Sequence, residues 1–533
     1  MLYSFRKGKD KKQDKEQPVF IMTFIRRYVI LSLFIFSINF SEESRILAIF
    51  PNPGHDGDIS NKALVTILLE RGHHVDLISR FEIIENVENS LGNYTFLLNF
   101  NEIDDYSESC SSSEFTSDPV WYTSEEFGNK LCNMLGDKEM QKLFRNLREN
   151  FKYDIILMEI FGAKCFIGLG EFLKAPVILI SNQVQLSWIE ESIVNPESIY
   201  ITNCFKELNS EASNIFTRLR NSLMILFQNY QFYRYTQRQT EIMRKYLDPK
   251  LPEITQMEKN VSLILSNSHY SLNSIRPLTS AFVQIGGLHI AEDKSKLSSK
   301  LKRWMDKNTK GIVYFDLGPK ILLENLPRKM IIAFLASFAK IKPFQVLLRV
   351  KDVEKLPLEL PRNVKACAHI PRIQVLAHKN VKAFITLGEN FALQEALYFG
   401  VPIIGISYSL VHSQNLQSLV EKFVAFEINF EDLNEPKINE ALTIVLNVKI
   451  ISQQAKRWSK IFKDRPSSAK ETAIYWIEYI IDGPKSFKSP TIFLDWYQYE
   501  LLDIYALLLF FLLSLIYSFV LILKKIKIEN FFL

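Results

Sequence analysis

The sequence has few cysteines, little net charge and no repeat. Its five cysteines show neither CxxC spacing nor a Cys/His cluster, which argues against a structural zinc site. The 64 basic and 59 acidic residues leave a formal charge of only +5, an excess too small to indicate nucleic-acid binding. Internal repeats of solenoid period are absent. What remains is an ordinary globular chain of 533 residues, long enough for two or three domains.

The cysteines and two sequons are compatible with a body in the secretory pathway. Cys110 and Cys132 are a candidate disulfide, although spacing alone does not fix the partners. The triplets that begin at Asn93 and Asn260 match the N-glycosylation sequon, and such triplets also arise by chance.

A short apolar segment near the N-terminus has the layout of a signal peptide. Residues 28–40 read YVILSLFIFSINF, follow Arg26 and Arg27, and precede the polar sequence SEES. The segment is short for a membrane span, and we expect cleavage near Ser41. Because a charged stretch precedes it, two alternatives stay open: translation starts at Met22 rather than Met1, or the segment is retained as an anchor.

A second apolar segment predicts a transmembrane helix. Residues 504–523 read IYALLLFFLLSLIYSFVLIL and carry no charge over the length needed to cross a bilayer. Lys524, Lys525 and Lys527 follow directly, so the positive-inside rule places the tail in the cytoplasm and the preceding body in the lumen. The sequence therefore predicts a single-pass type I membrane protein.

Between these segments, strand-like and helix-like patterns alternate in two series. The first series comprises residues 45–50, 74–79, 153–158 and 176–181, with a loop at 51–58 and a helical region at about 210–259. The second comprises residues 311–317, 344–350, 364–369, 381–386 and 402–406. Alternation of this kind predicts two α/β domains, each with a doubly wound parallel sheet, and a boundary near residue 291.

The expected parts of the chain are an extension and signal peptide, an N-terminal domain, a C-terminal domain, a juxtamembrane segment, the transmembrane helix and a cytoplasmic tail. They span residues 1–40, 41–290, 291–485, 486–503, 504–523 and 524–533, respectively.

Several motifs in the second half of the body resemble those of the animal UDP-glycosyltransferases, which include the glucuronosyltransferases. They are SNSHYSL from Ser266, GGLHI from Gly286, GIVYFDLG from Gly311, KAFIT from Lys382, QEAL with Glu395, and FGVP from Phe399. With FPNPG and ERGHHV in the N-terminal half, the resemblance covers nearly the whole body. It implies a GT-B fold, in which two Rossmann-like domains face each other.

The resemblance also implies an activity. Members transfer a sugar from a UDP-sugar to a small lipophilic acceptor with inversion, without a metal and with no cofactor besides the UDP-sugar co-substrate. Members are typically membrane proteins of the endoplasmic reticulum. Nothing in the sequence suggests a nucleic-acid partner, and it leaves open the acceptor, the donor sugar and whether the chain forms a homo-oligomer.

The catalytic positions implied by the resemblance are partly altered. The family's basic histidine, which takes the proton from the acceptor hydroxyl, aligns with Gly57, and His55 lies two residues earlier. His55 is therefore either the base in a rearranged loop or an exposed loop residue, and Asp58 is a further carboxylate at this place. Glu159 takes the position of the acidic partner, and a structural, salt-bridged glutamate is the alternative interpretation.

The donor positions depart further from the family. His369 and Arg372 stand where the family has the Trp and Gln of its uracil-binding motif. The diphosphate-binding His-Gly-Gly reads Leu387-Gly388-Glu389: the glycine is retained, a hydrogen-bond donor is lost at Leu387, and Glu389 places a carboxylate beside the phosphates. Phe391 replaces an asparagine.

Of the other donor positions, one is retained and the rest are changed. Glu395 is the residue that would bind the ribose hydroxyls. Val411 and His412 replace the aspartate and the glutamine of the sugar-binding pair, so the carboxylate that accepts from the sugar is lost, and Asp316 replaces a phosphate-facing serine. Two hypotheses follow: an active transferase, or a catalytically inactive member that acts as a luminal binding protein. UDP binding distinguishes them, because only the first requires it.

Overall fold

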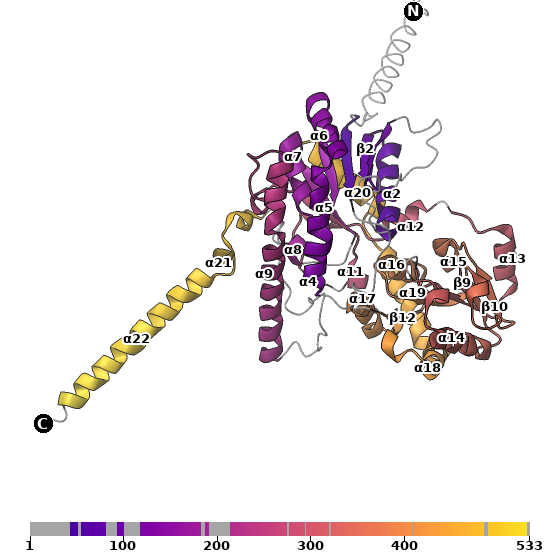
Figure 1. Cartoon of the computed structure of the whole chain (residues 1–533). Helices are drawn as coiled ribbons and strands as arrows, with labels where there is room; N and C mark the ends of the chain where they lie inside the picture. Colours follow the sequence, from indigo (N-terminus) through magenta and orange to yellow (C-terminus); the bar gives the residue numbers. More distant parts are fainter. Residues whose placement is uncertain are drawn as a thin grey trace, which may run out of the picture. The chain divides into compact units, whose positions relative to one another are not determined.

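Two parallel sheets organise the chain in the computed structural model, and Figure 1 shows them with their covering helices. The structure describes residues 43–51, 55–80, 93–100, 118–182, 187–190, 214–273, 275, 277–293, 295–318, 321–408, 410–483 and 489–529. The predicted signal peptide at residues 28–40, both candidate start codons and Cys110 lie outside these residues. From Ser44 to the C-terminus the chain forms one unit by its internal contacts.

The first sheet has seven parallel strands in the order β3-β2-β1-β4-β5-β6-β7. Their bounds are β1 Arg45–Phe50, β2 His74–Ser79, β3 Tyr94–Asn99, β4 Ile155–Glu159, β5 Val177–Ser181, β6 Leu263–Ser266 and β7 Phe282–Gln284. The central strands are runs of Ile, Leu and Val buried on both faces, as parallel sheets require. We call this sheet and its covering helices the first lobe.

The second sheet has six parallel strands in the order β10-β9-β8-β11-β12-β13. Their bounds are β8 Ile312–Phe315, β9 Gln345–Arg349, β10 Val364–Cys367, β11 Val381–Thr386, β12 Ile403–Ser407 and β13 Ala425–Asn429. This sheet with its helices is the second lobe. The prediction of two doubly wound α/β sheets is confirmed, and each predicted strand corresponds to a strand of the structure within a few residues.

Four strands were not predicted: β3, β6, β7 and β13. β7 is three residues long and β6 four, too short for a recognisable pattern. Every residue of β3 is only half-buried, so its sequence lacks the apolar run that marks a central strand. These strands lie at or next to the edges of the sheets, and they form only because they pair with a neighbouring strand.

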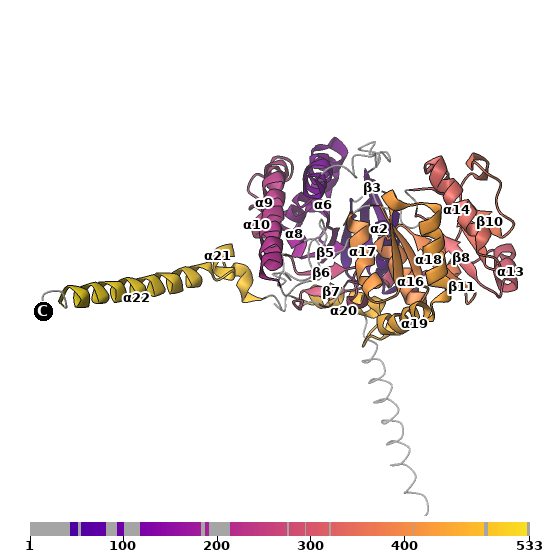
Figure 2. The same ribbon diagram turned by 90° about the horizontal axis from the view of Figure 1, so that it is seen from below.

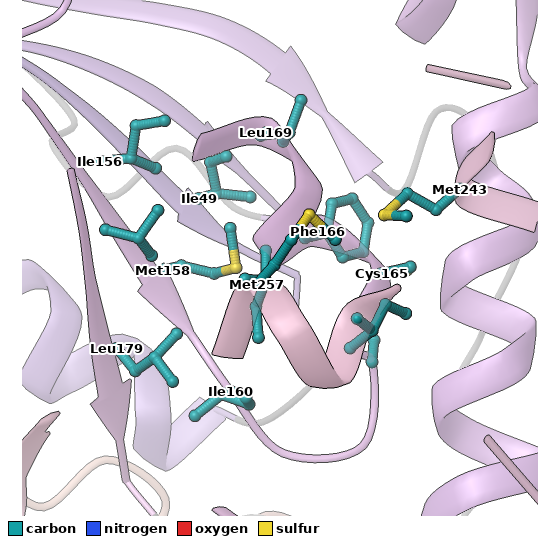
Figure 3. Packing of buried hydrophobic residues seen from close by; sticks show 14 of the residues in the cluster. Ile49, Ile156, Met158, Ile160, Cys165, Phe166, Leu169, Leu179, Met243 and Met257 are labelled. Carbon is teal, nitrogen blue, oxygen red and sulfur yellow. The ribbon is translucent and has the colours of Figure 1, made fainter. Parts of the chain in front are cut away.

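Helices cover both faces of the first sheet. One face packs against α2 His55–Glu70 and α12 Leu288–Glu292, and the other against α6 Lys138–Asn150, α7 Gly168–Leu173, α9 Ile215–Tyr246 and α10 Ile254–Glu258. Figure 3 shows the second of these cores, with Met243 of α9 and Met257 of α10 among side chains that include Ile156, Phe166 and Leu179. The predicted helical region at 210–259 is thus confirmed as α9 and α10.

The helix α20 Ala469–Ile481 follows the second sheet in sequence but packs on the first one. Ala473, Ile474, Ile477 and Ile480 belong to the same buried cluster as residues of α2 and β1. A capping box between Ser468 and Glu471 starts this helix. The predicted domain 291–485 therefore includes a final segment that belongs physically to the first lobe.

The second lobe has its own two apolar layers. One face of its sheet packs on α14 Arg328–Lys340 and α18 Glu435–Asn447. The other packs on α13 Ser299–Lys307, α15 Arg372–Leu376, α16 Asn390–Phe399, α17 Leu410–Glu421 and α19 Lys449–Lys463. α16 ends at Gly400, whose φ of 68° is the left-handed conformation that glycine adopts without strain.

The C-terminal helix α22 Leu502–Glu529 contains a candidate membrane span, Leu502–Ile526, with a mean hydropathy of 2.8 and no buried part. Among the residues that the structure describes, this is the one helix that is both long enough and apolar enough to cross a bilayer. This span contains the predicted residues 504–523. The short α21 Trp496–Tyr499 precedes it. The remaining short helices are α4 Pro119–Trp121, α5 Lys130–Asn133, α8 Ser187–Glu190 and α11 Tyr270–Asn273.

The proposed Cys110–Cys132 pairing is wrong. Cys132 in α5 forms a disulfide with Cys165, which begins the 3₁₀ turn η4 Cys165–Ile167 after β4, and both side chains are fully buried. Sequence spacing carries no information on this pairing, because the folding of the chain after β4 is what brings Cys165 under α5. Cys367 is a free, half-buried thiol.

We predict that the Cys132→Ala/Cys165→Ala variant is less stable by about 3 to 4 kcal/mol, the expected value for a loop of this size. The two cysteines are 33 residues apart in the sequence. Urea unfolding of the full-length protein in detergent measures this difference. Cys367→Ala is the matched control and should unfold like the wild type; equal stability of the double variant and the wild type would contradict the bridge.

Candidate functional site

The two lobes meet where the strands of the first sheet end and α16 of the second lobe begins. The Asn390 side-chain amide donates to the carbonyl oxygens of Asn267, at 3.1 Å, and Asn182, at 3.4 Å. Gln394, one turn further along α16, donates to the same Asn267 carbonyl at 2.9 Å and accepts from the Gly287 amide at 2.7 Å. All four bonds are buried, so they fix the start of α16 against the carboxyl ends of β5 and β6.

A buried carboxylate lies at this edge of the first sheet. Glu159 is the last residue of β4 and is only 4% exposed. Its two oxygens accept from the amide groups of Asn61, at 3.2 Å, and Asn182, at 2.8 Å, and Asn182 also donates to Asn61 at 3.1 Å. The network therefore fixes Glu159 in one orientation, at the place where the lobes meet.

The predicted loop at 51–58 is in part helix. α2 begins at His55, so Gly57 and Asp58 lie in its first turn, and Asn61 follows on the same helix. Acidic residues near the start of a helix are stabilised by its dipole, which explains why the polar HDGD sequence is helical. The side chains of residues 55–58 lie outside the described part of the structure. The base role of His55 therefore stays a prediction, on a helix that directly supports Glu159 through Asn61.

The carboxylate of Glu395, the candidate ribose-binding residue, is already bound by other side chains of the protein. The Arg372 guanidinium, at the start of α15, binds its carboxylate in a bidentate manner at 2.6 and 2.8 Å. His289 of α12 approaches the same carboxylate at 3.3 Å. Burial alone would raise the pKa of Glu395, but Arg372 and His289 outweigh it and lower the pKa to about 2. The residue expected to bind ribose is thus an ionised, fully buried carboxylate inside an ion pair.

Glu389 stands at the N-cap of α16, with its carboxyl against the backbone of Gly318. A Cβ on Gly318 would lie 2.7 Å from a Glu389 oxygen, and Gly318 has a φ of 92°. A negative charge at the N-terminus of a helix is electrostatically favourable. The same position would receive the diphosphate in the family, so Glu389 places a charge of the same sign as the ligand there.

The Asp316 carboxylate is also hydrogen-bonded within the protein. It accepts from the Arg349 guanidinium and the Gly318 amide, each at 2.9 Å, and from the Tyr314 hydroxyl at 2.8 Å. Burial, followed by the Asp316 charge and its hydrogen bond, raises the pKa of Tyr314 well above its usual value. Asp316 thus stabilises the turn after β8, in place of a hydroxyl that would face a phosphate.

The remaining donor candidates lie around these ion pairs. His369 follows β10 and lines a cavity of about 410 Å³ together with Lys296, Ser298 and Arg349. Gly388 links β11 to α16 with a φ of 90°, and its carbonyl accepts from Asn415 of α17 at 3.1 Å. His412 also belongs to α17. Within the described residues, no group of three or more His, Cys, Asp or Glu side chains is arranged for a metal ion.

The Phe391 ring, which replaces a polar family residue, packs against His289 in an edge-to-face contact at 5.0 Å. Phe391 is 4% exposed, so it fills the space at the start of α16 with apolar surface. The roles of Asn61, Asn182 and His289 were not predicted. Asn182 has a recognisable signal, since it follows a buried strand directly, and His289 belongs to the GGLHI motif; Asn61, within a helix, has none.

Two parallel α/β sheets whose carboxyl ends meet at a helix N-terminus define the GT-B class of glycosyltransferases. The fold agrees with solved structures of this class. A UDP-glucosyltransferase from Polygonum tinctorium, solved in complex with 3,4-dichloroaniline, superposes with a TM-score of 0.56 at 12% identity over 84% of this chain and 100% of that one. A glycosyltransferase of kitacinnamycin gives a TM-score of 0.53 at 15% identity.

Sequence comparison identifies the family. The family model described as "UDP-glucoronosyl and UDP-glucosyl transferase" matches residues 84–531. UDP-glucosyltransferase 2 of Dactylopius coccus is 30% identical over 496 residues, which cover 91% of this chain and 93% of the relative. UDP-glucuronosyltransferase 2B1 of Rattus norvegicus is 26% identical over 86% of this chain and 89% of its own length. The chain belongs to the UDP-glycosyltransferase family, and by this resemblance it is a transferase.

We predict that Arg372→Gln binds UDP about tenfold more tightly than the wild type, which corresponds to one or two regained hydrogen bonds. The substitution releases the Glu395 carboxylate and supplies an amide with both a donor and an acceptor. Calorimetric titration of the full-length protein with UDP measures the change, and the exposed Arg457→Gln on α19 is the control. Weaker binding by Arg372→Gln would instead assign Arg372 a direct contact with the nucleotide.

The Glu395 ion pair also predicts a pH dependence of stability. Because the folded pKa is about 2, below the usual value of 4.5, the stabilisation is fully present above pH 4.5 and is lost as the pH falls toward 2. The difference in free energy of unfolding between wild type and Glu395→Gln should therefore shrink from pH 6 to pH 3. A difference that is constant over this range would show that Glu395 does not titrate as an ion pair.

Proposed function

We propose that this protein transfers a glycosyl group from a UDP-sugar to the hydroxyl of a small lipophilic acceptor, with inversion and without a metal. The acceptor lies at the first lobe and the donor at the second. The observation that carries this proposal is the buried Glu159 carboxylate, held by two amides at the edge where α16 begins. A buried carboxylate in a fixed orientation is suited to orient a base and to stabilise its protonated form.

In this reaction, His55 takes the proton from the acceptor hydroxyl, and the hydroxyl oxygen attacks the anomeric carbon from the face opposite UDP. The bond between that carbon and the β-phosphate oxygen breaks, and UDP leaves with the electron pair. One displacement inverts the anomeric configuration. α2 supplies both His55 and Asn61, so the base and the support of Glu159 move as one rigid element.

Donor binding in this proposal requires a rearrangement of charge in the second lobe. The incoming ribose hydroxyls compete with Arg372 for the Glu395 carboxylate. The diphosphate meets the N-terminus of α16, where Glu389 must turn away from Gly318. We expect the free energy of these changes to make donor binding weaker than in a site with preformed hydrogen bonds.

The proposed location is a membrane of the secretory pathway, the endoplasmic reticulum in particular, with the body in the lumen. Three features support it: the apolar helix α22, the lysines that follow its apolar segment, and the buried Cys132–Cys165 disulfide, which forms in oxidising compartments.

Glu159→Gln is predicted to lower the turnover number by about 100-fold or more, because the amide cannot stabilise a protonated base. UDP binding should be unchanged, since Glu159 belongs to the first lobe. Release of UDP from UDP-sugars with a panel of phenols and other lipophilic alcohols measures turnover, and titration calorimetry measures UDP binding. Glu171→Gln, an exposed glutamate of α7, is the control.

Two results would overturn the proposal. Wild-type turnover by Glu159→Gln would remove the observation that carries it. A folded wild-type protein that binds no UDP at millimolar concentration would leave the alternative function, a luminal binding protein without transfer activity; the comparisons give no support to that alternative.

A further inference from the structure

One helix of the first lobe exposes a continuous apolar stripe. Over its first five turns, α9 presents large apolar side chains to solvent, among them Phe216, which is 77% exposed, and Phe227, which is 59% exposed. The full set, which we call the α9 stripe, comprises Ile215, Phe216, Leu219, Leu223, Leu226, Phe227, Tyr230 and Tyr233. Elsewhere in the described part of the two lobes, exposed large apolar residues are scattered along the chain.

The stripe lies on the side of α9 away from the core. Asn221, Ile225, Phe232, Gln239 and Met243 form the buried side of the helix. At 3.6 residues per turn, the centre of the α9 stripe lies roughly 150° around the helix from the centre of this buried side. Figures 1 and 2 show α9 at the margin of the first lobe, and it packs mainly against α4 and the π-helical segment η2 Tyr122–Asn129, with further contacts to α5 and α8. The stripe is therefore not an extension of the core.

The charged side chains that this half of α9 itself carries all have one sign. Residues 214–240 contain four arginines and no aspartate or glutamate. Arg220, Arg234 and Arg238 are exposed and lie along one margin of the stripe, and Arg218 lies on the other side. The acidic residues on the neighbouring segments already have partners: Asp118 accepts from Gln231, and on η2 Glu125 accepts from Asn129 and Glu126 pairs with Lys130. An apolar face bordered by cations is the pattern of a helix that lies in the headgroup region of a phospholipid bilayer.

We propose that the α9 stripe binds the surface of the bilayer in which α22 is anchored. The apolar side chains enter the boundary between headgroups and acyl chains, and the arginines bind lipid phosphates. The anchor raises the local concentration of bilayer at the stripe, so even a modest affinity suffices. The inference does not depend on the proposed reaction.

A second copy of the chain is a poorer occupant. A two-fold contact through the α9 stripe would bring the arginines of both copies to one interface, and this half of α9 carries no carboxylate to neutralise them. The phosphate groups of phospholipid headgroups supply the missing negative charge.

The test uses the full-length protein in liposomes, with the photocrosslinking residue p-benzoylphenylalanine in place of Phe227. The matched control carries it in place of Phe423, an equally exposed phenylalanine of the second lobe at 61%. After illumination, intact-mass measurement distinguishes a phospholipid adduct from a crosslinked dimer or an internal crosslink. Liposomes of phosphatidylcholine alone are compared with liposomes that also contain phosphatidylglycerol.

The expected result is a phospholipid adduct at position 227 with at least about fivefold the yield at position 423, higher with phosphatidylglycerol. Arg220→Gln combined with Arg234→Gln should lower the yield at 227 in these liposomes by roughly fivefold or more. A crosslinked dimer, an internal crosslink, or equal lipid yields at the two positions would each overturn the proposal.

Discussion

The two lobes depend on a few buried amide bonds at the start of α16. Asn390 and Gln394 reach from the second lobe to backbone carbonyls at the ends of β5 and β6, where ladder bonds have ended and these groups need partners. An unsatisfied buried carbonyl costs about 1 to 3 kcal/mol, so this contact is strongly specified. It sets the position of α16 relative to the Glu159 network, and thus the geometry of the candidate site.

Two buried carboxylates of the second lobe are paired with arginines of the same lobe. Glu395 pairs with Arg372, and Asp316 pairs with Arg349, so each carboxylate has its own cation. Breaking one side of a buried ion pair is far costlier than removing both partners. Arg372 therefore satisfies the buried Glu395 carboxylate without a nucleotide. The chain thus belongs to the family although the carboxylates of Glu395 and Asp316 are paired with arginines of the same lobe.

The fold was largely predictable, and the reasons are local. Runs such as RILAIF and VKAFIT are apolar on both faces and bounded by polar turns, which marks central parallel strands whatever surrounds them. β3 and β7 lack this signal because a half-buried or three-residue strand exists only through its neighbour. The predicted loop at 51–58 is wrong for the first turn of α2. The glycine and aspartates of HDGD disfavour a helix interior, but they are accepted at a helix start.

The sequence by itself determined the two parallel α/β sheets, the apolar C-terminal helix and the motifs of the family, because each depends on residues close together in the chain. Only the tertiary structure decided the partners: Cys132 with Cys165, Arg372 with Glu395, and Asn61 and Asn182 with Glu159. It also decided that one side of α9 stays exposed although its residues are as apolar as those of a core helix. Pairings and exposure depend on which distant segments share a surface, and only the folded chain establishes them.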